Sequence, residues 1–132
     1  MFLSSILSMA MMLVISPVEV EGPPLEFESH DLLEAWAEGS TFGGGRLYRL
    51  GPDAQGLYCA DRSHTSGVYS SELALYVQSG DSYRLVLYLP VKRFVQRKAW
   101  VQDETVIIEE RAMGQREGRV EMKVPLRMLD GL

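Results

Sequence analysis

The sequence predicts a small, mainly β protein: an antiparallel up-and-down meander of about seven strands behind one short N-terminal helix. Apolar residues alternate with polar ones from residue 46 onward, which is the period of a half-buried strand. The loops between these segments are short, whereas a parallel crossover needs a dozen or more residues. The 132 residues suffice for one domain. We therefore expect a curved sheet or a partly open barrel with the helix laid against it.

The composition sets the class of protein. Hydrophobic residues make up 46% and charged residues 23%, which is typical of a globular domain and excludes a collagen-like rod or a multi-span membrane protein. The single cysteine excludes an intramolecular disulfide framework. The net charge is -5, but every Lys and Arg lies at or after Arg46, so residues 1–45 carry -7 and the remainder +2. A body so close to neutral disfavours a dedicated nucleic-acid binder.

The N-terminus resembles an export signal in length and hydropathy. Residues 2–15 are apolar or small and uncharged, and Pro17 then breaks the helix. Fourteen residues rise about 21 Å as a helix, short of a ~30 Å bilayer core, so we expect no stable transmembrane span. The segment lacks a Lys or Arg before the apolar run and a clean cleavage site after it. We predict a signal peptide over 1–22 and a single β-rich domain over 23–132.

This interpretation makes the protein exported, either to the periplasm and cell envelope or secreted. Two alternatives place it in the cytoplasm. In the first, the start site is mis-assigned and Met9, Met11 or Met12 is the true start. In the second, the apolar N-terminus docks on the core of its own chain.

The segments before the meander have local signals. Residues 17–28 hold three prolines and four acids, which predicts an extended linker. Ser29 is an N-cap candidate, the apolar stripe of Leu32, Leu33 and Trp36 has helical spacing, and Gly39 supplies a stop, so we expect a helix over 29–38. Gly43–Gly45 lacks the Lys-Ser/Thr pair of a phosphate loop and is interpreted as a linker or hinge.

The meander extends over 46–127. The strongest strand is 83–91, because Tyr83, Leu85, Leu87, Leu89 and Val91 alternate without interruption and predict one apolar face. Its other face contains Val86 and Tyr88, which indicates a central strand or a covered second side. The expected strands are 46–50, 57–61, 72–77, 83–91, 94–101, 105–111 and 119–126.

The most polar segment, residues 61–66, contains the residue types of a nucleophilic triad. Asp61 and His64 are its candidate catalytic residues, yet no G-x-S-x-G elbow exposes a serine, and the same residue types build an ordinary turn. His30 is an alternative base, but it is followed directly by Asp31, and adjacent helical side chains diverge by about 100°. Asp31 suits the first turn of a helix through the helix dipole. Two histidines make a poor zinc set, so we expect no metal and no cofactor.

Cys59 lies on one face of a predicted strand beside Leu57. Free cysteine is among the most buried residue types, and Arg62 alone is thin support for a reactive thiolate. We expect a buried thiol; in an exported protein, an intermolecular disulfide is the alternative.

Basic and aromatic residues interleave between 92 and 100. Lys92, Phe94, Gln96, Lys98 and Trp100 share one face by alternation, whereas Arg93 and Arg97 belong to the other. The charge is thus split between two faces, as on an edge strand protected against aggregation. The alternative is a weak anion or nucleic-acid site, for which the acidic N-terminal segment is itself a candidate partner.

These observations favour a non-enzymatic β-rich domain that binds a partner protein or a small apolar ligand on a concave sheet. A small hydrolase or lyase that uses His64 in the mouth of the sheet is the alternative. The candidate ligand- or partner-binding residues are Tyr76, Tyr88, Lys92, Arg93, Arg97, Lys98 and Trp100.

Overall fold

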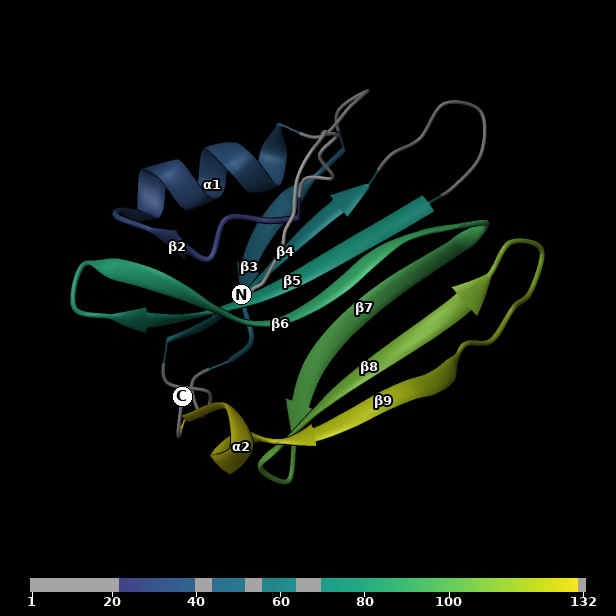
Figure 1. Ribbon diagram of the computed structural model, residues 1–132. Coiled ribbons are helices and arrows are strands. Elements are labelled where there is room, and N and C mark those ends of the chain that lie inside the picture. Colours follow the sequence, from purple (N-terminus) through teal and green to yellow (C-terminus); the bar gives the residue numbers. More distant parts are fainter. Residues whose placement is uncertain (1–21, 40–43, 52–55, 64–69, 131–132) are drawn as a thin grey trace, which may run out of the picture.

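The computed structural model describes residues 22–39, 44–51, 56–63 and 70–130. In these residues, eight strands form two antiparallel sheets that are not closed into a barrel, which confirms the mainly β, antiparallel prediction (Figure 1). The strands of the meander form two sheets, whereas we expected one curved sheet or a partly open barrel. The export signal, His64 and Gly43 of the predicted Gly43–Gly45 hinge lie outside the described residues.

The larger sheet has five strands. Its spatial order is β2-β6-β5-β4-β3, so β3 to β6 are neighbours in sequence and in space. The two-residue strand β2 corrects part of the predicted linker: Glu26 and Phe27 pair with Arg84 and Tyr83. Its strands are β2 (Glu26–Phe27), β3 (Arg46–Arg49), β4 (Leu57–Ser63), β5 (Ser70–Ser79) and β6 (Ser82–Arg93).

The smaller sheet has the order β7-β8-β9. A two-residue turn, Asp103-Glu104, joins its first two strands, and both turn residues have positive φ. The elements are β7 (Val95–Gln102), β8 (Thr105–Ala112), β9 (Arg119–Pro125) and the short helix α2 (Leu126–Asp130). Helix α2 was not predicted from the sequence. Its Leu129 is buried in the core.

Helix α1 (His30–Glu38) confirms the predicted helix. The hydroxyl oxygen of Ser29 accepts a hydrogen bond from the Leu32 amide at 3.2 Å, so Ser29 is the N-cap. The buried residues of the helix are Leu33 and Ala37, whereas Leu32 is 54% exposed, so the buried stripe differs by one position from the predicted one. This stripe covers one face of the five-stranded sheet.

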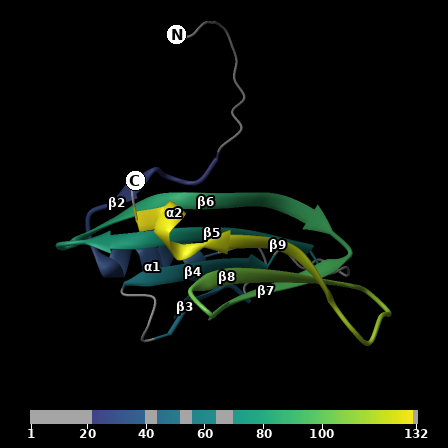
Figure 2. The same cartoon turned by 90° about the horizontal axis from the view of Figure 1, so that it is seen from below.

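The three-stranded sheet covers the opposite face. Leu73 and Leu75 of β5 join one apolar cluster with Ala99 of β7 and with Val106 and Ile108 of β8. In the second view, β7 to β9 lie in front of the five-stranded sheet (Figure 2). The molecule therefore has three layers, and the central sheet is covered on both faces.

A bulge changes the faces of β6. Leu75 pairs with Leu87, and the next residue, Tyr76, pairs with Leu85, which leaves Val86 as the extra residue on β6. Tyr83 and Leu85 therefore pack on the α1 side, whereas Leu87 packs on the side of the three-stranded sheet. The predicted single apolar face of 83–91 is wrong, because alternation in sequence carries no information about the bulge.

The corner between the two sheets is one residue long. Phe94 separates β6 from β7 and has φ 67°, the left-handed conformation that non-glycine residues rarely adopt. The predicted strand 94–101 thus begins one residue later, at Val95. This corner turns the chain from the first sheet into the second.

Candidate functional site

An open cleft of about 690 Å³ lies beside the first half of β7. The five-stranded sheet contributes one wall, and β7, β8 and the loop after β8 contribute the other. Five basic and three acidic side chains line the cleft, so its walls carry a net charge of +2. The lining residues are Arg46, Asp61, Ser70, Ser71, Gln96, Arg97, Lys98, Glu109, Arg111, Arg116, Glu117 and Gly118.

Arg97 joins the two sheets beneath this cleft. It lies on the inward face of β7 and is only 8% exposed. Its Nε and Nη2 donate to the two carboxylate oxygens of Glu121 at 3.0 and 3.4 Å. Its Nη1 donates to the carbonyl oxygens of Ser71 and Pro90 at 3.1 and 3.0 Å. Four of the five N–H groups of the guanidinium thus have acceptors within the protein, so its main contribution to the cleft is positive potential.

Asp61 is the acidic group on the opposite wall. Its Oδ2 lies 3.7 Å from Nε of Arg46, and its side chain is 17% exposed. Burial raises the pKa of this carboxyl group above its usual value, while the charges of Arg46 and Arg97 oppose that shift. A carboxyl group with a raised pKa beside a cleft is a candidate for binding or proton transfer.

Ser71 has an unusual hydroxyl group. The residue is 3% exposed, and its Oγ has no hydrogen-bond partner among the residues described here. A buried hydroxyl without a partner costs free energy, typically about 1–3 kcal/mol. Because Ser71 also lines the cleft, a group bound there is positioned to compensate that cost.

The cations at the mouth of the cleft are less neutralised. Nη1 of Arg111 donates to the carbonyl oxygen of Gln115 at 3.3 Å, and Nη2 donates to Oε1 of Gln96. Both acceptors are neutral. Within the described ranges, neither Arg111 nor Arg116 forms an ion pair, and both are exposed. In contrast, Lys98 lies 3.7 Å from Glu109.

The structure brings some of the predicted site residues together. Asp61, Arg97 and Lys98, which the sequence assigned to separate sites, line one cleft. Lys92 lies at the end of β6, and its Nζ donates to both carboxylate oxygens of Glu110 at 2.8 and 3.0 Å. Because the chain turns at Phe94, Lys92 and Lys98 lie on different faces, so the prediction that they share one face is wrong.

The other two candidate binding residues between positions 92 and 100, Arg93 and Trp100, do not line the cleft. Arg93 is exposed at the end of β6. Trp100 has Nζ of Lys98 at 5.4 Å from its ring centroid and donates from Nε1 to Oε1 of Gln102 at 3.4 Å. Within the described part of the acidic segment, Glu26 is opposite Arg84 of β6 in register, and no ion pair joins that part to residues 92–100.

Tyr76 and Tyr88 lie on the α1 side of the sheet. Tyr76 is fully buried, and its hydroxyl donates to the carbonyl oxygen of Pro24 at 2.7 Å. The Tyr88 hydroxyl donates to Oε2 of Glu72 at 2.5 Å, while Arg62 lies 3.2 Å from Oε1 of the same carboxylate. Burial, followed by the bond to Glu72, raises the pKa of Tyr88 to about 12. The Tyr76 bond fastens the N-terminal segment to the sheet, and neither tyrosine lines the cleft.

Cys59 is fully buried, which confirms the predicted buried thiol. Burial raises its pKa, so the reactive thiolate is disfavoured. Its neighbour Tyr48 accepts a hydrogen bond from the Ala99 amide at 3.2 Å, which links β3 to β7. This pair belongs to the core between the sheets.

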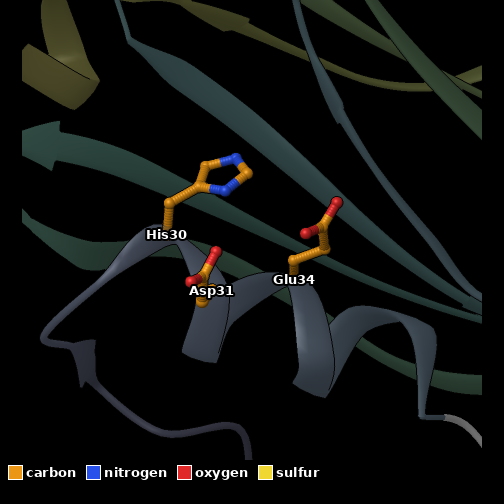
Figure 3. Close-up of side chains that lie close together, drawn as sticks. All are labelled: His30, Asp31 and Glu34. Carbon is orange, nitrogen blue, oxygen red and sulfur yellow. The ribbon is translucent and has the colours of Figure 1, made fainter.

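His30, Asp31 and Glu34 form a second polar cluster at the start of α1 (Figure 3). Their donor atoms lie within 4.8 Å of one another, closer than the expected divergence of neighbouring helical side chains implies. The imidazole packs edge-on against Tyr58 and Tyr83, at centroid distances of 5.7 and 5.9 Å. The positive end of the helix dipole opposes a cation here and favours the carboxylate of Asp31, the acidic residue of the first turn. The cluster thus serves the helix.

Ser71, Arg46, Arg111 and Arg116 were absent from the sequence-based site. Their only signal was polarity at positions beside apolar strands, which is also the signal of ordinary surface residues.

No known family model, curated protein or solved structure matches this chain. Among the described residues, neither helix has the length and hydropathy to cross a bilayer.

Proposed function

We propose that this chain is an exported, non-enzymatic binding module that holds an extended acidic segment of a partner protein in the cleft between its sheets. The observation that carries this proposal is the positive lining of the cleft, in which Arg111 and Arg116 form no ion pair within the described residues. Arginine binds carboxylates through two parallel hydrogen bonds, so it suits Asp and Glu side chains of a partner.

The position of β7 favours an extended occupant. It is one of the two edge strands of the three-stranded sheet, and its residues Gln96, Arg97 and Lys98 line the cleft. An edge strand offers backbone donors and acceptors to which an extended peptide adds as a further strand. The acidic side chains of such a peptide then lie beside the arginines.

An apolar ligand has less support than an acidic one. The face of the central sheet that was expected to be concave and free is covered by the three-stranded sheet, and Leu73, Leu75 and Ile108 pack between them. The other face is covered by α1, beneath which Tyr76 is fully buried. Both candidate ligand surfaces are thus occupied by the protein itself.

A hydrolase remains the second candidate function, on the observation that Asp61 combines a raised pKa with a place in the cleft. Its proposed partner His64 lies outside the described residues. A hydrolase screen on the wild type, Asp61→Asn and His64→Ala tests this function. Turnover that both substitutions abolish would favour the enzyme over the binding module.

The binding proposal is tested with a fluorescein-labelled deca-glutamate peptide and fluorescence anisotropy over a salt series. We expect affinity that falls with rising salt, and a roughly tenfold loss in the double variant Arg111→Ala/Arg116→Ala. The matched control is Lys123→Ala/Arg127→Ala, which removes two exposed cations outside the cleft lining. Equal losses in both double variants would show unspecific attraction and would contradict the proposal.

Export is tested separately, by mass spectrometry of the N-terminus of the protein purified from its native host. A mature chain that begins near residue 23 supports export. An intact Met1 on protein from the cytosolic fraction contradicts it.

A further inference from the structure

Three large apolar side chains are exposed at one end of the molecule. They are Val91 near the end of β6, Phe94 at the corner and Met113 after β8, with exposed fractions of 48%, 52% and 43%. The Met113 amide donates to the carbonyl oxygen of Phe94 at 2.8 Å, so these two residues are neighbours. The corner and the loop after β8 project at the same end in both views (Figures 1 and 2). We call Val91, Phe94 and Met113 the apolar tip.

Phe94 differs from an ordinary exposed residue because its backbone has a positive φ. At φ 67°, a residue with a Cβ costs roughly 1–2 kcal/mol relative to glycine. Folding alone therefore favours glycine or asparagine at this corner. A half-exposed phenyl ring in a strained backbone indicates that the ring has a role outside the fold.

Cations surround the apolar tip. Arg93 precedes Phe94, and Arg111 precedes Met113 by two residues; both are exposed. Arg116 follows in the loop after β8, where Glu117 is the one acidic residue between positions 111 and 118. The acidic residues of β2 and α1 lie at a distance from this end, as Figure 1 shows for the two elements. In the two segments that form this end, residues 91–94 and 111–118, four cations thus stand against one acid.

We propose that the apolar tip docks this protein on an anionic lipid surface. Phe94 and Met113 enter the interface between headgroups and acyl chains, and the surrounding arginines contact the phosphate and other anionic oxygens of the headgroups. The convex shape of a corner suits insertion into lipid, whereas a protein partner of ordinary size needs a broad complementary face. The occupant is inferred from charge complementarity together with apolar exposure. Arg111 and Arg116 are shared with the proposed peptide site, whereas Phe94 and Arg93 belong to the tip alone.

Vesicle co-sedimentation of the purified chain tests this proposal. We expect binding to phosphatidylcholine vesicles that contain about one third phosphatidylglycerol, and weak binding to pure phosphatidylcholine. Phe94→Gly removes the ring while relieving the backbone strain, so the variant remains folded, and its vesicle affinity should fall roughly tenfold. Arg93→Glu should lower the affinity about fivefold or more. A Phe94→Trp variant should show fluorescence that brominated lipid quenches beyond that of wild type.

Matched controls lie away from the tip. Leu32→Ser removes an apolar side chain with 54% exposure from α1, and Lys123→Glu reverses a charge on β9. Both should leave vesicle binding unchanged. Absence of binding to the anionic vesicles at low salt, or equal effects of Phe94→Gly and Leu32→Ser, would overturn the proposal. Neither Phe94 nor Arg93 lines the cleft, so deca-glutamate binding should survive these substitutions and the two proposals fail separately.

Discussion

The two faces of the five-stranded sheet are covered by different chemistry. Beneath α1, aromatic rings pack closely: the ring centroid of Phe27 lies 5.3 Å from that of Tyr76 and 5.8 Å from that of Trp36. On the same face, Arg62 and Tyr88 both donate hydrogen bonds to the carboxylate of Glu72. On the other face, aliphatic side chains fill the space between the sheets near Ile108, but charged groups replace them toward Arg97 and Asp61.

This difference separates structural polar groups from groups available to a ligand. On the α1 face, Glu72 bonds both a tyrosine and an arginine, and Tyr76 bonds the incoming chain at Pro24. On the cleft face, Arg97 bonds Glu121 and two carbonyl oxygens. Ser71, by contrast, has a buried hydroxyl without a described partner, and Arg111 bonds only neutral oxygens. Polar residues predicted as one ligand-binding set thus have two separate roles.

The largest expected effect comes from removing Arg97. Arg97→Ala loses the Glu121 pair and the bonds to two carbonyl oxygens between the sheets, so the free energy of unfolding should fall by about 3–5 kcal/mol. Urea denaturation measures this loss. Lys98→Ala is the matched control, because its side chain is 63% exposed and its ion pair should contribute less than about 1 kcal/mol. Similar losses in the two variants would mean that Arg97 does not hold the sheets together.

A smaller effect is expected on the α1 face. Tyr88→Phe removes the hydrogen bond to the Glu72 carboxylate and should lower the free energy of unfolding by about 2 kcal/mol. The control is Tyr83→Phe, in the same apolar cluster, whose hydroxyl donates no hydrogen bond to a described residue. Denaturation curves compare the two. If Tyr83→Phe costs as much, ring packing rather than the polar network stabilises this face.

Relief of backbone strain should stabilise the smaller sheet. Glu104 has φ 60° in the two-residue turn between β7 and β8, a position that favours glycine in such hairpins. Glu104→Gly should raise the free energy of unfolding by about 1 kcal/mol, as read from thermal denaturation. Phe94→Gly should raise the free energy of unfolding by a similar amount, but only Phe94→Gly should also lose vesicle binding. Loss of vesicle binding in both would attribute the effect to the sheet and not to the tip.

The smallest effect concerns the pH dependence of stability at Asp61. Burial raises its folded-state pKa above the unfolded value of about 3.9, so the folded state binds the proton more tightly. The contribution of Asp61 is therefore fully present below the unfolded pKa and is lost as pH rises through the folded pKa. Asp61→Asn should lack this decline when unfolding is measured across acidic to neutral pH. An unchanged pH profile would show that Asp61 is not buried enough to disfavour its charge.

Local patterns predicted the elements well because they depend on neighbours in the chain. Ser29 capped the helix as expected, and the alternation around Leu73 and Leu75 placed β5 within a few residues of its observed ends. The faces of β6 could not be predicted, because the bulge at Val86 depends on pairing with β5. The cleft was equally inaccessible, since Asp61 and Arg97 are far apart in sequence and meet only when the second sheet folds over the first.

The sequence by itself determined a mainly β, antiparallel meander with one N-terminal helix and a buried cysteine. Period-two alternation and short loops leave few other arrangements. Only the tertiary structure decided that the meander divides into two sheets at Phe94, that Arg97 joins them, and that a charged cleft remains beside β7. The physical reason is that alternation reports which side of its own strand a residue occupies, whereas a cleft is defined by which strands face one another across the fold.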